Sequence, residues 1–592
     1  MKLKWVIIFI CLTAAQSMLG VDLYVSPEGS DASNGSKEAP FKTIERAQQA
    51  ARMTDKSRPG ETVVYLCDGV YTPGQTIQFD ARDSGTETHP VIYRAYPGAT
   101  PVISGGRRLT GWKKSGQLVW EAPIGDFDFR QMYVNGKKAL RARFPNQGDY
   151  LNLTSWNEKQ RSILLPSGSV QDWQDFSQAE IHIQMVWSIA IMRLQTFSMT
   201  DDGVELTVTN PERDLVFKRE HPRKLPDQSF HFENSRAFID KPGEWSINLK
   251  EGTCFYLPRF GEDLNAAEVI VPQLETLVSI EGALDQPVCN LRFEGLTFMY
   301  SNWTRPNHHG YLNLQAGQYT INPTVKNTQY VGRPPAAVYA ACIKNVVFSR
   351  NVFKHLGSTA LDLHYGSSHC EVVGNVFYDI SGTAVSEARL SDPNVPIHTP
   401  YNPTDPRDRS VNDVIQNNYI HSVGFDYGGA IGILCGYTTG VTIDHNELRD
   451  LAYTGISVGW GWNPAPNAMR DNQIHSNLID HPMALFTDGA GIYTLSPMPG
   501  TVITRNFVKN MQHPEGATSV HTSKCYYLDE RSGGITLKDN FWENIDREVE
   551  RMFFHKPGNI QILPENTAAV SAVRAEAGLM SEYKGIKKLA VD

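Results

Sequence analysis

The stretch that decides the fold is Ile443-Asp-His-Asn446-Glu-Leu448, because its pattern returns at Ile474-His-Ser-Asn477-Leu-Ile479. Each copy has an apolar residue, two variable residues, an asparagine, one further residue and a second apolar residue. The seven copies, separated by 24, 43, 28, 31, 29 and 34 residues, contain Asn351, Asn375, Asn418, Asn446, Asn477, Asn506 and Asn540. The segment Leu291 to Phe298 looks like an earlier copy with Gly295 in the place of the asparagine. A repeat of this period indicates a solenoid with one coil per copy.

The apolar positions of the repeat are rich in β-branched and aromatic residues, which favours strands over the helices of a helical or leucine-rich repeat. In such a stack each strand pairs with the equivalent strands above and below. Asparagine at a tight bend tolerates left-handed backbone geometry and hydrogen-bonds its neighbours. Unequal spacing is expected, because insertions between strands become loops. The sequence therefore predicts an all-β fold, a right-handed parallel β-helix.

The segments outside the repeat divide the chain further. A short positive region, the apolar stretch Trp5 to Ala15 and small residues after it are typical of a signal peptide, which predicts a secreted protein, periplasmic or extracellular. From about residue 107 the repeat is absent and short strands with many aromatics take its place. We expect a signal peptide at 1–20, a cap and first coils at 21–106, an inserted β-sandwich-like domain at 107–287, the main β-helix with the active site at 288–560, and a helical tail at 561–592.

Composition excludes several classes of function. The formal net charge is −9 and no long basic run occurs, so nucleic acid is not an expected partner. No further segment resembles a membrane span. The cysteines are scattered without metal-type spacing such as C-x-x-C, so neither a disulfide framework nor a zinc site is expected. We expect no cofactor and no metal ion, and the partner we expect is an oligosaccharide or polysaccharide. The oligomeric state does not follow from the sequence.

A second apolar segment follows each asparagine copy and stacks in the same order. Asp488 lies in a glycine-rich bend just before one of these segments, and Asp529 and Glu530 lie at the end of the next one. Adjacent coils are about 4.8 Å apart. Carboxyl groups from neighbouring coils can therefore reach the separations that glycosidases use, roughly 5–5.5 Å or 6.5–9.5 Å. One acid protonates the leaving oxygen while the other attacks the anomeric carbon or activates water. Asp488 and Asp529 are the predicted catalytic pair.

Further residues on or near this face are candidates for binding the sugar. Exposed indoles beside acids suit sugar stacking, although packing under a loop is an equal alternative for the two tryptophans of Val458-Gly-Trp460-Gly-Trp462. Asp426 has a sequence context like that of Asp488. The full set of predicted substrate-binding residues is Glu530, Asp426, Trp460, Trp462, Tyr493, His364, Glu387, Trp303 and His308.

Several longer motifs carry a family resemblance. They are Tyr24-Val-Ser-Pro-Glu-Gly-Ser-Asp31, Arg130-Gln-Met-Tyr-Val-Asn-Gly136, Arg141-Ala-Arg-Phe-Pro145, Lys241-Pro-Gly-Glu-Trp245, Gly455-Ile-Ser-Val-Gly-Trp460, Asp488-Gly-Ala-Gly-Ile-Tyr493 and Tyr527-Leu-Asp-Glu530. Together the chain resembles glycoside hydrolase family 141, and several motifs are shared with the β-xylosidases of family 120. The resemblance implies an α-L-fucosidase acting on pectin, such as a side chain of rhamnogalacturonan II, and some members of the family are xylanases.

The same resemblance implies an aspartate pair that matches Asp488 and Asp529. The chain departs from the family pattern at Ala490 and Cys525, which stand in place of glycines, and at Arg531, which follows the Asp-Glu motif where glycine is usual.

Three other readings stay open at this point. A xylan-active glycosidase would have the same architecture. A polysaccharide lyase would need a Lys or Arg base and usually a cation that neutralises the uronate carboxyl, and Arg389 and Arg531 are the cations expected on this face. A non-catalytic sugar-binding surface protein would show the same aromatics but would not require acids grouped on consecutive coils.

Overall fold

The structure is a computed structural model that describes residues 19–170, 176–323, 329–391, 393–514, 516–517, 521–562 and 569–590. The expected signal peptide therefore lies almost wholly outside the described residues, and strand β1 (Leu19–Val25) begins where it would end. No helix in these ranges has the length and apolar character needed to cross a membrane.

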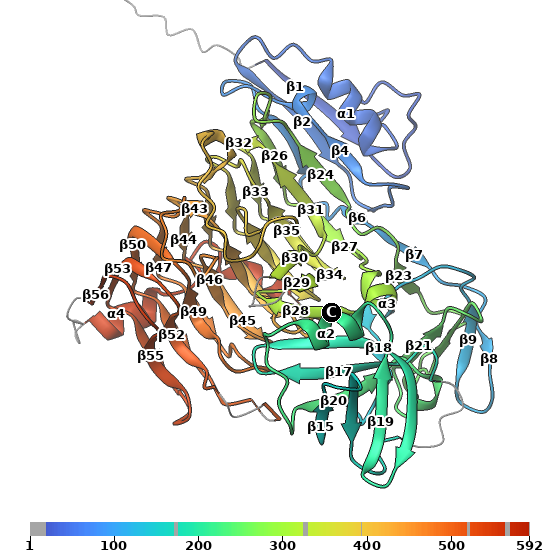
Figure 1. The fold of residues 1–592 in the computed structure, drawn as a ribbon. Coiled ribbons are helices and arrows are strands. Elements are labelled where there is room, and N and C mark those ends of the chain that lie inside the picture. Colours follow the sequence, from blue (N-terminus) through green and yellow to red (C-terminus); the bar gives the residue numbers. More distant parts are fainter. Residues whose placement is uncertain are drawn as a thin grey trace, which may run out of the picture.

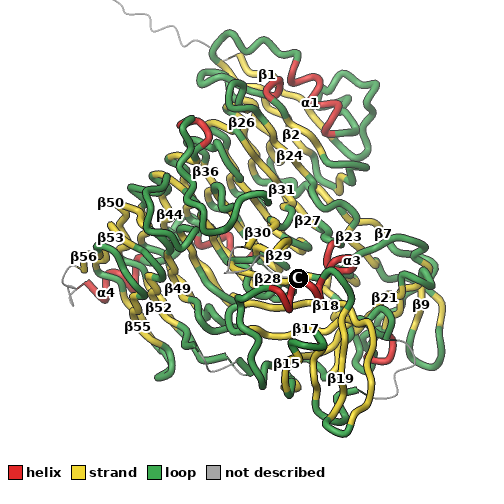
Figure 2. Tube along the Cα trace, viewed as in Figure 1, coloured by secondary structure: helices red, strands yellow, loops and turns green. Residues whose placement is uncertain are grey.

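Three long sheets of parallel strands run the length of the described solenoid, one strand of each sheet per coil (Figures 1 and 2). Sheet 1 carries the strands that precede the repeat asparagines. In order, its strands are β1, β2 (Gly60–Leu66), β5 (Val91–Ala95), β26 (Leu291–Glu294), β33 (Val347–Ser349), β36 (Glu371–Val373), β40 (Val414–Gln416), β44 (Thr442–Asp444), β47 (Gln473–His475), β50 (Pro497–Thr504), β53 (Gly533–Lys538) and β56 (Ile560–Ile562).

In the coils from β2 to β53, sheet 2 follows the turn after sheet 1, and sheet 3 follows sheet 2. Sheet 2 contains β3 (Val70–Tyr71), β6 (Val102–Ser104), β27 (Thr297–Met299), β34 (Val352–Leu356), β37 (Val376–Ile380), β41 (Tyr419–Val423), β45 (Glu447–Leu451), β48 (Leu478–Asp480), β51 (Phe507–Lys509) and β54 (Phe541–Glu543). Sheet 3 contains β4 (Ile77–Phe79), β24 (Val278–Glu281), β31 (Ala336–Ala341), β35 (Thr359–Leu363), β38 (Val385–Glu387), β42 (Ile433–Cys435), β46 (Ile456–Val458), β49 (Ala490–Thr494), β52 (Lys524–Leu528) and β55 (Glu550–Phe554). Two short pairs, β25 (Val288–Cys289) with β32 (Ile343–Lys344) and β39 (Ser410–Val411) with β43 (Thr438–Thr439), add to the coils.

The repeat asparagines form a buried ladder along the turn between sheets 1 and 2. The Asn446 backbone N–H and side-chain amide both donate to Oδ1 of Asn477 at 3.0 Å, and its amide also donates to the Ile415 carbonyl at 2.8 Å. The left-handed residue of the turn is the one before the asparagine, for example His445 with φ 52°, so the expectation that the asparagine itself is left-handed is wrong. Gly295 likewise takes the position before the ladder, and Leu296 donates its N–H to Asn351 Oδ1.

The solenoid interior is one continuous apolar core. Stacked phenylalanines mark it, with ring centroids 4.8 Å apart for Phe353 and Phe377 and 5.0 Å apart for Phe298 and Phe353. Helix α1 (Ile44–Arg52) covers the open N-terminal end, where it buries Ile44, Ala47 and Ala51 in this core. The cap removes an exposed edge that would otherwise invite association.

The inserted domain begins after β6 and has two parts with separate cores. The smaller part is built from two sheets, which consist of β7 (Gly106–Arg108), β8 (Lys113–Lys114), β9 (Trp120–Pro123), β10 (Tyr133–Val134), β11 (Lys137–Lys138), β12 (Leu140–Arg141), β21 (Glu244–Asn248), β22 (Thr253–Tyr256) and β23 (Val269–Pro272). The larger part holds β13 (Arg143–Phe144), β14 (Leu151–Asn152), β15 (Ser155–Asn157), β16 (Ser162–Leu165), β17 (Glu180–Met185), β18 (Ser188–Thr200), β19 (Gly203–Val208), β20 (Ser229–Glu233), helix α2 (Glu212–Lys218) and the 3-10 turn η2 (Arg236–Phe238).

The insertion is tied to the solenoid by pairing as well as by packing. The excursion after β27 contains α3 (Arg305–His309), β28 (Tyr311–Gln315), β29 (Gln318–Pro323) and β30 (Gln329–Gly332), and β28 pairs with β18 of the insertion. The expected end of the insertion at 287 is too late, because β24 already pairs with β4 and β31 in sheet 3. In Figure 1 strands β17 and β18 lie beside the later coils.

The C-terminal tail follows strand β56. The segment expected at 561–592 therefore begins two residues too early, because residues 561 and 562 still belong to β56. Helix α4 (Ala569–Glu576) packs Val573 on Phe507 and Phe541. The 3-10 turn η4 (Lys584–Leu589) lies near Val376 and Tyr419 of earlier coils, so the tail runs back along sheet 2. Two more 3-10 turns, η1 (Ala81–Asp83) and η3 (Pro406–Asp408), lie in loops.

Candidate active site

Asp488 lies in the turn immediately before β49, with left-handed φ of 56°. The Tyr453 hydroxyl donates to the Asp488 carbonyl at 2.9 Å. This approach needs Gly489, because a Cβ there would lie 2.6 Å from the Tyr453 ring. The glycine-rich bend seen in the sequence is therefore what lets the preceding coil hold the backbone of Asp488.

Lys524, the first residue of β52, forms an ion pair with Asp488 at 3.1 Å between Nζ and Oδ1. Its side chain is only 3% exposed, and Nζ lies 4.2 Å from the centroid of the Tyr527 ring. Sequence reasoning missed Lys524 and expected Arg389 and Arg531 as the cations of this face. The signal was the register of consecutive coils, since Lys524 pairs with Ala490, two residues after Asp488.

Asp529 follows the end of β52 and is mostly buried. The Tyr493 hydroxyl donates to its Oδ2 at 2.5 Å, and Nδ1 of His555 lies 2.9 Å from its Oδ1. Burial raises the pKa of Asp529 above its ordinary value; the two hydrogen bonds lower the pKa, and the negative charge of Asp488 raises it again. The net shift is upward, so this carboxyl holds its proton to a higher pH than an exposed aspartic acid.

The two aspartates lie at opposite ends of neighbouring strands. Strand β49 pairs with β52 from Ala490–Lys524 to Thr494–Leu528, so Asp488 precedes the paired segment and Asp529 follows it. The spacing between adjacent coils alone therefore does not bring the two carboxyl groups together. Three side chains connect the two aspartates. Lys524 pairs with Asp488, and its Nζ lies over the Tyr527 ring. The Tyr527 ring centroid lies 5.1 Å from that of Tyr493, whose hydroxyl donates to Asp529.

The insertion supplies a wall beside Asp488. The Thr487 N–H donates to the Val186 carbonyl at 3.2 Å, at the tip of the β17–β18 hairpin. The next residue, Trp187, lies near His221 with ring centroids 6.4 Å apart. Burial lowers the pKa of His221, and His398 and Glu530 lie near enough to affect that pKa too. Residues from the insertion and from the solenoid therefore meet around the aspartate pair.

Three of the predicted substrate-binding residues lie at this place. Tyr493 and Glu530 are the partner and the sequence neighbour of Asp529, and the Glu530 carboxylate pairs with Lys556 at 2.8 Å. Trp462 is half-buried, packs against the cluster that contains Tyr493 and Tyr527, and has its ring 5.6 Å from that of His398.

Three others are buried, which removes them as direct sugar contacts. Trp460 is 1% exposed and donates its indole N–H to Ser391, so it packs under a loop. Trp303 is buried against Tyr427. Glu387 is fully buried inside the solenoid, where it accepts a hydrogen bond from Thr438.

The last three are placed elsewhere. His364 follows β35, which β38, β42, β46 and β49 separate from β52, and burial lowers its pKa to about 2. Asp426 pairs with Lys138 of the insertion at 2.8 Å and so anchors that domain. His308 lies on α3 and pairs with Asp128 at 2.8 Å. The structure brings none of these three into the chain of contacts between Asp488 and Asp529.

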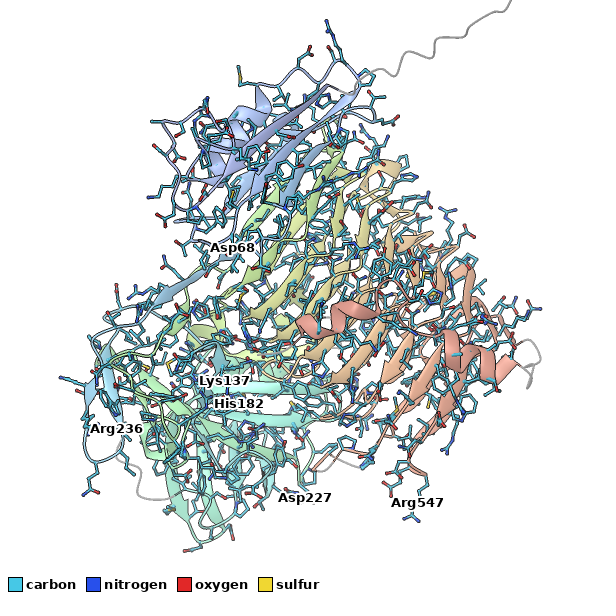
Figure 3. All side chains as sticks on the ribbon, turned by 180° about the vertical axis from the view of Figure 1, so that it is seen from behind. Asp68, Lys137, His182, Asp227, Arg236 and Arg547 are labelled. Carbon is cyan, nitrogen blue, oxygen red and sulfur yellow. The ribbon has the colours of Figure 1, made fainter. Side chains whose placement is uncertain are left out.

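One group within the described ranges has the ligand spacing for a metal ion: His182, His231 and Glu233 on β17 and β20. Figure 3 labels His182 within the insertion. His182 Nε2 already lies 2.9 Å from the Glu180 carboxylate, which also pairs with Arg130 and Arg141. Two buried guanidinium groups beside the cluster oppose a divalent cation.

Comparisons with known proteins agree with this architecture. The family model of the GH141 insertion domain matches residues 118–259. A solved structure described as a glycoside hydrolase is 32% identical, covers 95% of this chain and 100% of its own, and has a TM-score of 0.90. Pectate lyase PEL9 of Emericella nidulans is 31% identical over 163 residues, 26% of this chain and 37% of the lyase. The uncharacterized protein YwoF of Bacillus subtilis is 40% identical over 83 residues, 14% of this chain and 15% of YwoF.

The chain thus spans well under half the length of these two curated relatives, whereas its likeness to the solved glycoside hydrolase extends over both chains. The insertion that forms the wall beside Asp488 is the same segment that the family model matches. The chain belongs to glycoside hydrolase family 141.

Proposed function

We propose that this protein is a secreted glycosidase that releases a terminal sugar, an α-L-fucoside, from a pectic polysaccharide such as rhamnogalacturonan II. The observation that carries the proposal is the unequal aspartate pair: Asp529 is buried with a raised pKa, and Asp488 is ion-paired with Lys524. Pairs of acids whose environments separate their protonation are how glycosidases divide the acid and base roles.

In this proposal Asp529 is the general acid. Its proton goes to the glycosidic oxygen as the bond to the anomeric carbon breaks, and the resulting carboxylate accepts the Tyr493 and His555 hydrogen bonds. Asp488 acts as the carboxylate that attacks the anomeric carbon or activates water. The Lys524 ammonium pairs with Asp488 and holds its carboxylate in one position.

The choice of sugar rests on the family resemblance, and the pectic polymer is supported by the local likeness to a protein named as a pectate lyase. Secretion rests on the apolar N-terminal segment in the sequence. Trp462 offers a half-buried apolar surface beside Tyr493 on which the C–H face and methyl group of a 6-deoxy sugar can pack.

A lyase is the main alternative, and Lys524 is the cation that could serve as its base. The ion pair with Asp488 argues against that role, because it occupies the side chain that would have to accept the proton of the substrate. The metal-spaced cluster of the described residues is in the insertion, beside two arginines rather than beside Asp488. Hydrolysis is therefore the reaction that the arrangement supports best.

The test measures both reactions in one incubation with rhamnogalacturonan II and with an aryl α-L-fucoside. We expect free fucose and no rise in the ultraviolet absorbance of an unsaturated uronate. Asp488→Asn and Asp529→Asn should each lower kcat by about 10³-fold, and Asp202→Asn, in the exposed β18–β19 turn, should match the wild type.

Each other outcome has a definite meaning. An unsaturated product identifies a lyase, and release of xylose from xylan identifies the xylan-active alternative. Activity retained in both aspartate variants overturns the catalytic pair.

A further inference from the structure

A groove of about 350 Å³ lies beyond the carboxyl-terminal ends of sheet 3. Its walls include Pro464, Pro497, Pro499, Gly534, Arg531 and Lys556. Pro464, Arg531 and Lys556 follow strands β46, β52 and β55 of sheet 3, whereas Pro497 and Pro499 belong to β50 and Gly534 to β53, the next strands of sheet 1. The groove therefore crosses several coils, in the direction in which the solenoid grows.

The groove adjoins the aspartate pair through the chain itself. Arg531 is two residues after Asp529, and Lys556 directly follows His555, which contacts Asp529. The Ser496 N–H donates to the Glu530 carbonyl at 3.1 Å, so the rim of the groove is fixed to the loop that carries Asp529. A sugar polymer bound at Asp529 can extend into this groove.

The groove is positively charged at its surface. Arg531 and Lys556 are both exposed, and Lys556 forms an ion pair with the carboxylate of Glu530. Within the described part of the chain Arg531 makes no ion pair or hydrogen bond through its side chain. Two cations and one carboxylate leave a net positive charge, and a free guanidinium can bind a carboxylate with two parallel hydrogen bonds.

Apart from Asn559, the remaining lining consists of prolines and glycines. Pro464, Pro497 and Pro499 present ring carbons, and Gly534 has no side chain where a Cβ would lie 2.6 Å from Pro499. Proline rings are preorganised surfaces on which the C–H face of a pyranose can pack without loss of side-chain entropy. The combination of apolar walls and a free guanidinium matches an acidic sugar better than a neutral one.

We infer that this groove binds a uronate residue of the polymer that carries the scissile sugar, with its carboxylate on Arg531 and its ring against the prolines. The inference rests on the proposed function and adds to it a subsite that recognises a uronate carboxylate.

Binding without turnover tests the inference. Titration calorimetry on the full chain carrying Asp529→Asn measures the Kd for trigalacturonate and for the same trisaccharide with its carboxyl groups reduced to alcohols. We expect binding of the acid, at least tenfold weaker binding of the reduced sugar, and loss of affinity at high salt. Arg531→Gln should weaken trigalacturonate binding about 3–10-fold, with Arg531→Lys in between.

Lys538→Gln is the matched control, because Lys538 is an exposed cation on β53 of the same coil but outside the groove. It should leave the Kd unchanged. Equal affinity for the acidic and reduced sugars, or an unchanged Kd in a folded Arg531→Gln variant, overturns the inference. Arg531-dependent binding without any release of fucose would leave this site standing and refute the proposed reaction instead.

Discussion

The Tyr493 hydroxyl donates to Oδ2 of Asp529 across the boundary between two coils, with 2.5 Å between the two oxygens. Tyr493 belongs to β49, the strand that follows Asp488, while Asp529 follows β52. One hydrogen bond thus couples the strand that positions the first aspartate to the protonation of the second. The pKa of Asp529 therefore depends on Tyr493, a residue of the neighbouring coil.

Tyr493→Phe should shift the alkaline limb of the pH–activity profile to higher pH. The hydrogen bond stabilises the Asp529 carboxylate and lowers its pKa, so its removal raises the pKa further and keeps the acid protonated for longer. We expect a shift of about one pH unit in kcat/KM. Tyr65→Phe, on β2 at the far end of the solenoid, is the control. A shift to lower pH would contradict the acid role of Asp529.

Lys524→Met should lower kcat far more than it changes KM. The substitution keeps the length of the side chain but leaves Asp488 without its counter-charge in a partly buried site. We expect a loss of about 10–100-fold in kcat with thermal stability close to that of the wild type. Lys509→Met is a matched control, because it breaks a similar pair with Asp480 on sheet 2. A loss confined to KM would show that Lys524 binds substrate instead of positioning Asp488.

Glu387 and Asp413 form a buried carboxyl pair in the solenoid core, and burial raises the pKa of both. Because the folded chain holds protons that the unfolded chain releases above the ordinary glutamate pKa of 4.5, stability falls as the pH rises above that value. Glu387→Gln, which mimics the protonated acid, should flatten this fall and raise Tm at pH 9 relative to the wild type.

The comparison for Glu387→Gln is Tm between pH 5 and pH 9, measured beside Glu371→Gln, an exposed position on β36. The wild type and the Glu371 variant should lose stability in parallel, by up to about 1.4 kcal/mol per pH unit for one proton. A Glu387→Gln profile as steep as theirs would place the titrating groups elsewhere.

Most of the solenoid could be predicted because its information is local. The spacing of Asn446 and Asn477 reports a turn that recurs once per coil, and the structure turns that spacing into a hydrogen-bonded ladder. The same repeat predicts that Asp488 and Asp529 lie on neighbouring coils, and strands β49 and β52 beside them do pair. What local patterns do not contain is the length of strand between the two residues, which places them at opposite ends of β49 and β52.

The site residues that sequence reasoning missed or misplaced depend on distant contacts. Trp460 is covered by a loop that contains Ser391, and Asp426 is occupied by Lys138 from the insertion, 288 residues earlier in the chain. Lys524 and His555 carry no motif of their own. Only the strand register, which no single segment encodes, brings them to Asp488 and Asp529.

Asn477→Ala should destabilise the chain more than Asn540→Ala does. Asn477 is fully buried, donates to Asn506 Oδ1 and to the Ile443 carbonyl, and accepts from Asn446. Its loss leaves buried hydrogen-bonding groups on both sides of one coil without a partner, which lowers the free energy of unfolding by about 1–3 kcal/mol for each group. Asn540 is the last copy of the repeat, so its loss interrupts the ladder on one side only.

Stability in a stacked solenoid is a sum of coil terms and nearest-neighbour interface terms, so an interior break weakens two interfaces and a terminal break weakens one. Urea unfolding should therefore show a drop in midpoint for Asn477→Ala about twice that for Asn540→Ala, while Asn157→Ala, on the half-buried edge strand β15 of the insertion, should have little effect. Equal losses at the two ladder positions would mean that the asparagines act one by one. In that case each turn by itself, and not the continuity of the ladder, would hold neighbouring coils in register.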